Sequence, residues 1–336
     1  MNFRKYPGFL LIKEIIMPLR RLWPILLLCL LETGLILYFS IGYNLYTQFT
    51  TVEHGGDNSA NLPTHFTSGF DNRDLSAYWI PAYETVTIES RQPGLHLAAW
   101  YIPADQPDAP VVILIHGTSG CKCNSSNLLA AGMLHRHGFS VADFDLRNMG
   151  LSDIEDGRHA AGTKEYLDAL GVFDWLVKVK GVPSYRIGIW GVSLGAATAL
   201  DAFAAEAQLA AVFADSSFSD METIIKEELV RSGYPAWLAP GGLLMAKIIS
   251  GDDLMSRSPT DAMRTHGGRP IFLAHGQLDQ RIYVHHSQDL LALGQQNGAN
   301  IQAWFVPNAG HIGAIWQNTA EYEQKLVAFF EQALKK

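Results

Sequence analysis

The sequence predicts an α/β fold in which helices cover both faces of a mostly parallel, eight-stranded sheet. Apolar runs of strand length alternate with helix-prone segments from about residue 83 to residue 334, and the run 111–117 is typical of a strand buried on both faces. Another such run, 187–190, leads through a Gly-x-Ser-x-Gly turn into small helix-forming residues. The helix-prone, apolar stretch 221–268 interrupts the alternation. We expect it to form a lid over a site, and ordinary helical packing against the sheet is the alternative.

The other elements follow in chain order. Alternating segments at 85–90 and 95–102 flank a Gln-Pro-Gly turn at 92–94, which predicts a hairpin. Further strands are expected at 140–145, 210–215, 270–275 and 301–306, and helices at 126–135, 163–178, 284–293 and 319–334.

Composition limits the class of protein. The chain has 336 residues, of which 48% are hydrophobic, and this is enough for one large core in one or two domains. The formal net charge is -8, and no cluster of basic residues predicts a nucleic-acid partner.

Residues 23–43 form an apolar stretch long enough to cross a bilayer as a helix, with Glu32 as its single acid. Aromatic residues lie towards its ends, as in membrane interfaces: Trp23, Tyr38, Tyr43 and Tyr46. We expect an uncleaved signal anchor, because the stretch exceeds the apolar region of a signal peptide and no small-x-small cleavage site follows. A cleaved signal and a buried core helix are the alternatives.

Charge sets the expected orientation of this anchor. Five basic residues precede it: Arg4, Lys5, Lys13, Arg20 and Arg21. The first basic residue after it is Arg73. The positive-inside rule therefore predicts a cytoplasmic segment at 1–22 and an extracytoplasmic remainder, with a linker at 44–82 and a domain at 83–336.

The cysteines carry little information. Cys29 lies in the apolar stretch, and the Cys-x-Cys spacing of Cys121 and Cys123 is too sparse for a metal site. We expect two free thiols in a loop, with a strained or transient disulfide as the alternative.

The Gly-x-Ser-x-Gly turn, Gly191 to Gly195, is expected to hold Ser193 in a strained backbone conformation above the sheet edge. Small residues on both sides of the serine let the strand and the helix approach each other. The amide of Leu194 would lie at a helix N-terminus, where it can stabilise a developing oxyanion.

Polar residues follow three of the expected strands, at the carboxyl edge where ligands of parallel sheets bind. They are Ser193, Asp279 and His311, which is the chain order of a known nucleophile, acid and base arrangement. His311 would accept the serine proton, and Asp279 would orient its imidazole ring. The amide of Thr118, in the loop after 111–116, is the expected second oxyanion donor.

Other polar residues have expected structural roles. Asp145, Arg147 and Asp168 are expected in loop ion pairs and turn caps. His116 and His275 each precede a glycine at the end of a strand, and we expect them to orient loops. Asp215 is the alternative acid to Asp279, and His285 and His286 are expected to be exposed on a helix.

These motifs resemble the α/β-hydrolases, and among them the serine hydrolases with an N-terminal membrane anchor. The turn His116-Gly117 resembles the family's oxyanion motif, and 145–152 is similar to its Asp-x-Arg-Gly-x-Gly-x-Ser loop, with Asn148 in place of the first glycine. Segments 162–168, 275–279 and 310–311 match further motifs, so the resemblance covers roughly residues 83 to 334.

The resemblance implies a serine hydrolase that cleaves carboxylic ester or thioester bonds through an acyl-enzyme, without a metal or organic cofactor. The apolar lid and the anchor favour acyl or lipid-like substrates. A peptidase of the prolyl-oligopeptidase-like type and a catalytically silent binding module are the alternatives, and the oligomeric state is open.

The orientation is testable with reporters fused after residue 60. A reporter that works only outside the cytoplasm should be active, and one that works only in the cytoplasm should be silent, because the basic segment stays inside. Activity of the cytoplasmic reporter alone would contradict the predicted orientation.

Overall fold

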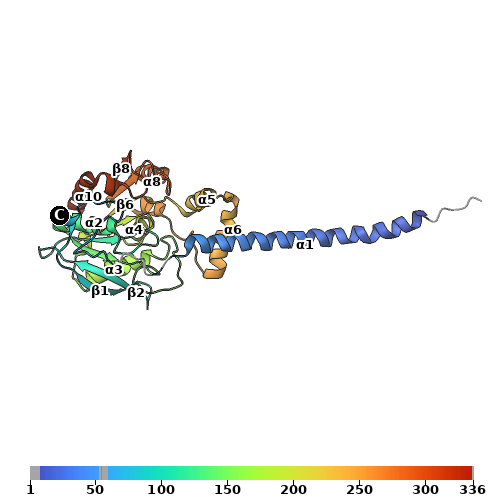
Figure 1. Cartoon of the computed structure of the whole chain (residues 1–336), viewed down its shortest axis with the longest axis horizontal. Helices are drawn as coiled ribbons and strands as arrows, with labels where there is room; N and C mark the ends of the chain where they lie inside the picture. Colours follow the sequence, from blue (N-terminus) through green and yellow to red (C-terminus); the bar gives the residue numbers. More distant parts are fainter. Residues whose placement is uncertain (1–7, 53, 55–59, 335–336) are drawn as a thin grey trace, which may run out of the picture.

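A computed structural model describes residues 8–52, 54 and 60–334. In it, the domain that follows the N-terminal helix is built on one mixed sheet (Figure 1). The strand order is β1-β2-β4-β3-β5-β6-β7-β8. The bounds are β1 (Glu84–Glu89), β2 (His96–Ile102), β3 (Val111–Ile115), β4 (Ser140–Phe144), β5 (Ile187–Val192), β6 (Ala211–Asp215), β7 (Ile271–Gly276) and β8 (Ile301–Val306). Strand β2 pairs antiparallel with β1 and β4, and the other pairs are parallel. The predicted α/β-hydrolase architecture is confirmed.

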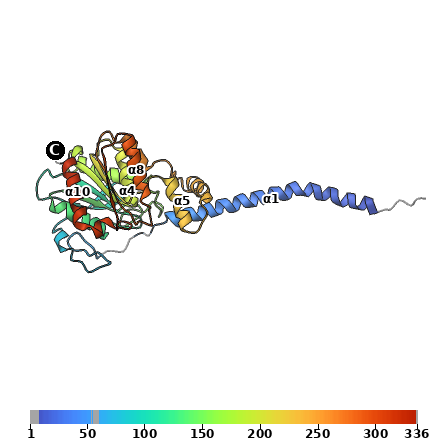
Figure 2. The same ribbon diagram turned by 90° about the horizontal axis from the view of Figure 1, so that it is seen from above.

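Helices pack on both faces of this sheet. Val112 and Leu114 of β3 pack with the apolar faces of α2 (Ser125–Arg136) and α10 (Thr319–Leu334). Ile113 and Ile115 point to the opposite face, where α3 (Tyr166–Lys178), α4 (Leu194–Ala205) and α8 (His285–Gln296) lie (Figure 2). Because successive residues of a strand point to opposite faces, a continuous apolar run is needed when both faces are covered.

Helix α1 (Gly8–Thr50) projects from this domain as a single 43-residue helix. Its apolar part, Leu22–Thr50, is long enough to cross a membrane. The helix continues past the predicted end of the span, residue 43, because Leu45 and Tyr46 are buried against the domain. The Tyr46 hydroxyl donates a hydrogen bond of 2.5 Å to Asp252.

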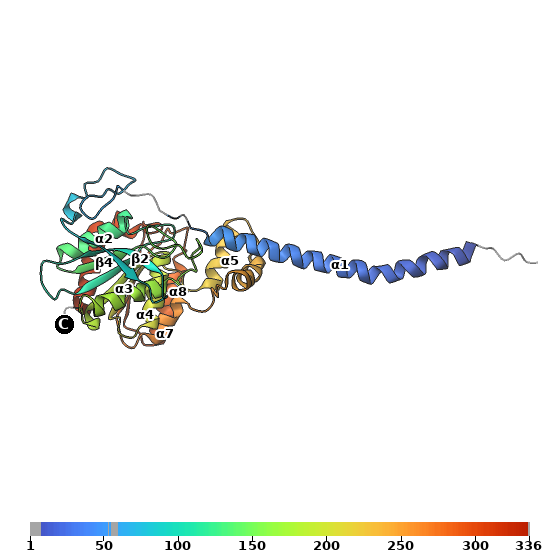
Figure 3. The ribbon, with the colours of Figure 1, turned by 90° about the horizontal axis from the view of Figure 1, so that it is seen from below.

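Residues 221–268, which we call the lid, are mostly helical as predicted. They form α5 (Met221–Arg231), η3 (Ala236–Leu238), α6 (Ala239–Met245), η4 (Ala246–Ser250), η5 (Pro259–Asp261) and α7 (Ala262–Thr265). Asp220 caps α5 by accepting a hydrogen bond of 2.9 Å from the Thr223 amide. Helices α5 and α6 lie away from the sheet, beside the end of α1 that enters the domain (Figure 3).

Glycines bring α6 and α1 into close contact. A Cβ atom at Gly42 would lie 2.7 Å from the carbonyl carbon of Gly241, and one at Gly241 would lie 2.7 Å from the ring of Tyr38. Small residues at such a crossing let two helix backbones approach, as they do between membrane helices.

The predicted pair of free thiols is wrong, because Cys121 and Cys123 form a disulfide. A turn closed by the Asn124 amide and the Cys121 carbonyl, 2.9 Å apart, brings the two Cα atoms to 5.0 Å. This separation lies within the range that a disulfide requires. The prediction of free thiols assumed that cysteines two residues apart cannot reach each other easily, and the turn brings them together.

The disulfide predicts the alkylation pattern of the denatured protein. Without reduction, iodoacetamide should modify Cys29 alone, and after reduction it should modify three cysteines, adding two carbamidomethyl groups by mass spectrometry. Three modified cysteines before reduction would show that the bond is absent from the isolated protein.

Candidate active site

Ser193 lies at a sharp turn between β5 and α4, where its backbone has φ 56° and ψ -121°. A non-glycine residue at positive φ is strained and needs support from its surroundings. A Cβ atom at Gly191 would lie 2.2 Å from the Gly195 carbonyl oxygen, and one at Gly195 would lie 2.3 Å from the Ile115 carbonyl oxygen. The two glycines are therefore required by backbone contacts on either side of the serine.

Ser193, His311 and Asp279 form one hydrogen-bonded chain. The Ser193 hydroxyl donates to His311 Nε2 over 3.0 Å, and His311 Nδ1 donates to Asp279 Oδ2 over 2.7 Å. The residues follow β5, β8 and β7, so the carboxyl edge of the parallel strands brings them together from positions up to 118 residues apart. The structure places the three residues predicted from the sequence within direct contact.

The Asp279 carboxylate is buried and well supplied with donors. Its Oδ1 accepts from the amides of Arg281 and Ile282 at 2.8 and 2.9 Å. Burial acts to raise the pKa of Asp279, but hydrogen bonds from His275 and His311 outweigh it and lower the pKa well below its usual value. Asp279 is thus a carboxylate that can hold the His311 ring in a single orientation.

His275 supports this acid, in agreement with its predicted role as a loop-orienting residue. Its Nε2 donates to the Ile282 carbonyl over 2.9 Å and lies 3.3 Å from Asp279 Oδ2. Its Nδ1 accepts from the Ser287 hydroxyl over 2.7 Å.

Thr118 and Leu194, whose amides are the predicted oxyanion donors, lie beside Ser193. Thr118 and Leu194 line the same cavity as Ser193, and among the hydrogen bonds of the described residues neither backbone amide is a donor. Leu194 is the first residue of α4, where the helix dipole also favours an anion.

His116 holds the loop that carries Thr118. Its Nδ1 donates to the Gly117 carbonyl over 2.8 Å, and its Nε2 accepts from the Leu146 amide over 3.1 Å. Burial lowers the pKa of His116, which keeps the ring neutral for this pair of bonds. A Cβ atom at Gly117 would lie 3.3 Å from Ser193 Cβ, so the loop passes directly over the serine.

Asp215, the alternative acid, has other partners. It accepts hydrogen bonds from Ser216 Oγ at 2.9 Å and from the Tyr322 hydroxyl at 3.0 Å. Ser216 Oγ in turn accepts from the Ile312 amide over 3.2 Å. Burial raises the pKa of Asp215. This group supports the turn after His311, and Asp279 is the acid that contacts the histidine.

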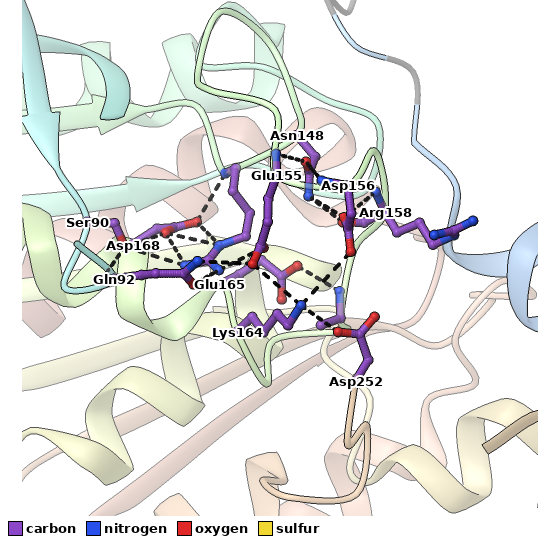
Figure 4. A network of polar contacts seen from close by, with 12 residues as sticks. Ser90, Gln92, Asn148, Glu155, Asp156, Arg158, Lys164, Glu165, Asp168 and Asp252 are labelled. Carbon is purple, nitrogen blue, oxygen red and sulfur yellow. Dashed lines mark hydrogen bonds and ion pairs between the residues drawn. The ribbon is translucent and has the colours of Figure 1, made fainter. Parts of the chain in front are cut away.

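Arg147 and Asp168 form an ion pair, as predicted, but the pair is buried inside the protein. The two side chains are fully buried, with Arg147 Nη2 2.6 Å from Asp168 Oδ1, and Figure 4 shows their neighbours Ser90 and Gln92 (Figure 4). Asp145 is also buried and contacts Lys122 Nζ at 2.5 Å. Lys122 was not among the predicted site residues, because a lysine between two cysteines resembles an exposed loop residue.

Asn148 replaces a glycine of the hydrolase loop motif, and its conformation and contacts show how the loop accommodates the change. Its backbone has φ 65°, which asparagine tolerates better than most residues. Its side-chain oxygen accepts from the amides of Glu155, Asp156 and Gly157, and its nitrogen donates to the Arg158 carbonyl over 2.6 Å. Asn148 therefore organises a loop that a glycine could not hold through a side chain.

The prediction that His285 and His286 are exposed is wrong for His286, which is fully buried. The Nε2 atoms of His285 and His286 contact the two carboxylate oxygens of Glu227 at 2.7 and 3.0 Å. Glu227 belongs to lid helix α5, so the histidines join the lid to the core.

The same three residues have the composition of a metal site, with ligand atoms within 4.8 Å of one another. His286 Nδ1 accepts from the Ser219 amide over 3.2 Å, so its proton lies on Nε2 and points to Glu227. A metal at Nε2 would move that proton to Nδ1, against the Ser219 N–H. The geometry fits a hydrogen-bonded contact between lid and core.

A cavity with about 920 Å³ of empty space, including its open mouth, leads to Ser193. Its walls come from the domain, from the lid and from the end of α1, and most of its lining atoms are apolar. The wall residues from α1 are Leu45, Tyr46, Phe49 and Thr50. Sequence analysis assigned them to a linker, and only the helical periodicity of their apolar members could have indicated the packing.

Comparisons with known proteins agree with this architecture. The model of the prolyl oligopeptidase family matches residues 129–336. The chain is 26% identical over 247 residues to the uncharacterised protein YfhR of Escherichia coli, covering 72% of this chain and 78% of that protein. It is 28% identical over 141 residues to an uncharacterised 31.7 kDa protein from the traX-finO intergenic region of Escherichia coli, covering 41% of this chain. The latter match spans about half of the relative, 48% of its length.

Solved structures with the same fold include esterases and a peptidase. An esterase from Pyrococcus furiosus has a TM-score of 0.63 at 22% identity, covering 78% of this chain and 95% of the esterase. An acylaminoacyl peptidase from Pyrococcus horikoshii has a TM-score of 0.57 at 20% identity, covering 76% of this chain and 42% of the peptidase. At these identities the likeness establishes a shared fold.

The turn geometry predicts unequal effects of two alanine substitutions. Gly191→Ala should lower the free energy of unfolding by about 3 kcal/mol, because its Cβ meets backbone atoms that cannot move apart freely. Gly310→Ala is the control, since the nearest atom to its Cβ is 4.0 Å away. Urea unfolding followed by circular dichroism measures both, and equal stability of the two variants would contradict the proposed role of the close contact.

Proposed function

The chain belongs to the prolyl oligopeptidase family, and we propose that it is a membrane-anchored serine hydrolase cleaving carboxylic ester or thioester bonds. The observation that carries the proposal is the hydrogen-bonded chain of Ser193, His311 and Asp279, whose serine lines a largely apolar cavity. Their contacts and their position at the carboxyl edge of the sheet support catalytic roles for these residues.

The proposed reaction has two stages. Ser193 Oγ attacks the substrate carbonyl carbon while His311 Nε2 takes the hydroxyl proton, and the positive imidazole is stabilised by Asp279. The amides of Thr118 and Leu194 would stabilise the oxyanion. Its collapse breaks the bond to the leaving group, which receives the proton from His311 and departs as an alcohol or thiol.

Water completes the cycle in the second stage. His311 takes a proton from water as the hydroxide attacks the acyl-enzyme, and a second oxyanion forms between the same two amides. Its collapse returns the proton to Ser193 and releases the acid.

The cavity lining favours an acyl ester over a peptide with a free amino terminus. Glu228 is the one acidic residue among the described lining residues, and it already pairs with Arg231 and Arg281. No unpaired carboxylate in that described lining is available to bind a substrate ammonium group. An acylated peptide would not require one, so the peptidase of this family remains the second candidate.

Location of the domain outside the cytoplasm is part of the proposal. The basic residues before α1 favour a cytoplasmic N-terminus, and the Cys121–Cys123 disulfide suits an oxidising compartment. The catalytically silent alternative has less support, because the nucleophile, base, acid and two free amides are all present together.

Turnover of p-nitrophenyl esters of increasing chain length, measured beside N-acyl-aminoacyl p-nitroanilides, tests the function. We expect ester hydrolysis to exceed anilide hydrolysis, and Ser193→Ala and Asp279→Asn to lower kcat by about 10³-fold or more. Ser184→Ala, a serine replacement outside the cavity, should retain wild-type kcat. Preference for the anilides would favour the peptidase, and ester turnover equal in Ser193→Ala would contradict the proposed nucleophile.

A further inference from the structure

The lid exposes an apolar face that the core does not cover. Trp237 and Ile248 are 64% and 66% exposed, and Leu244 and Ile249 are also exposed. These four residues, which we call the lid face, belong to the consecutive elements η3, α6 and η4. A patch of this kind, on a soluble surface, marks an interaction site.

The lid face adjoins the membrane-spanning helix. The ring of Trp237 stacks on that of Tyr38 with centroids 5.8 Å apart, and the Tyr38 hydroxyl donates to the Trp237 carbonyl over 3.3 Å. Farther along the lid, Met245 of α6 and Ile249 of η4 share an apolar groove with α1 residues that include Leu35 and Ile36. The lid therefore extends along α1 into the part of the helix predicted to lie in the bilayer.

The length of α1 sets the depth of this contact. Residues 22–37 are exposed along the projecting helix and extend about 24 Å at 1.5 Å per residue. A hydrocarbon layer about 30 Å thick requires about 20 residues, and Arg20 and Arg21 mark its beginning. The layer then reaches roughly residue 41, beyond Tyr38, where the lid packs.

Residues of the same junction line the active-site cavity. Leu238, Gly242 and Leu243 of the lid line it together with Leu45 of α1, and Ser193 lies in its wall as well. Apolar side chains thus line a continuous route from the α1–α6 contact to the proposed nucleophile.

We propose that the lid face is embedded in the bilayer leaflet on the side of the hydrolase domain, and that lipid-like esters enter the active-site cavity directly from this leaflet. The lipid surface is the partner because the lid face continues the apolar surface of a membrane helix at matching depth. Aromatic Trp237 and Tyr38 lie inside the apolar layer within about one helical turn of its end, close to the interface where such aromatics are common. Lys247, beside Ile248, pairs with Asp253 and can extend to the lipid headgroups. The entry route rests on the proposed function, whereas the embedding of the lid face does not.

The first test uses the full chain reconstituted in phosphatidylcholine vesicles that contain lipids brominated on their acyl chains. Bromine quenches tryptophan fluorescence on contact, so the difference in quenching between wild type and Trp237→Phe isolates the lid face. We expect the variant to lose a measurable part of the quenched emission. Identical quenching would place Trp237 outside the acyl region and overturn the proposal.

The second test compares two esters in the same vesicles: a water-soluble p-nitrophenyl acetate and a long-chain fluorogenic ester dissolved in the bilayer. Ile248→Glu should lower turnover of the bilayer ester about 10-fold or more, because a charge opposes insertion of the lid face, and leave the soluble ester within about 2-fold. The control is Val179→Glu at the end of α3, which is equally exposed at 66% and should change neither rate.

The outcomes separate the two proposals. Equal loss of both ester activities in Ile248→Glu, or no loss of either, would overturn the entry route. Absence of ester hydrolysis in wild type would contradict the proposed function, while the bromolipid test would still measure embedding. If two lid faces cross-link to each other and bromolipids do not quench Trp237, the partner of the lid face is a second copy of the chain, and the proposed lipid contact is wrong.

Discussion

The positive φ of Ser193 is the constraint on which the site depends. The strained turn is held on both sides: the Ser193 amide donates to the Asp215 carbonyl over 2.9 Å, and its carbonyl accepts from the Ala196 amide over 3.0 Å. These bonds fasten the serine to β6 and to the first turn of α4. Gly191 and Gly195 let the backbones come close enough for both bonds to form. The hydroxyl then lies at the strand ends, where His311 can reach it.

Helix α1 is part of the architecture of the hydrolase-fold domain as well as a candidate membrane span. The Val52 amide donates to the Gly157 carbonyl, and the His159 amide to the Thr50 carbonyl, at 3.1 and 2.8 Å. Asp252 of the lid connects Tyr46 of α1 with Lys164, whose Nζ lies 2.5 Å from its carboxylate. Because the helix end is bonded to both domain and lid, the cavity that these parts line together has a fixed position relative to the apolar part of α1.

Local signals were sufficient to predict the sheet and the main site residues. The apolar runs define buried strands, and Ser193, Asp279 and His311 each follow a strand at a glycine-rich turn, which is why their proximity could be expected. The structural roles of His116 and His275 followed in the same way from their positions at strand ends.

What sequence could not predict depends on contacts with distant segments or on the closure of a local turn. The burial of His286 requires Glu227, 59 residues away on a lid helix, and the disulfide requires a turn whose closure is invisible in the spacing. The contribution of Phe49 to the cavity was hidden in a stretch whose polar composition resembles a linker. In each case the partner, and not the residue itself, determines the environment.

The most direct measurement of the central claim is the site of covalent modification by a fluorophosphonate, mapped by mass spectrometry of the folded, full-length protein. A phosphonylated peptide containing Ser193, with no labelling of Ser193→Ala, is the predicted result. Failure of the folded wild-type protein to react, or an adduct on another serine that persists in Ser193→Ala, would contradict the assignment of Ser193 as the nucleophile.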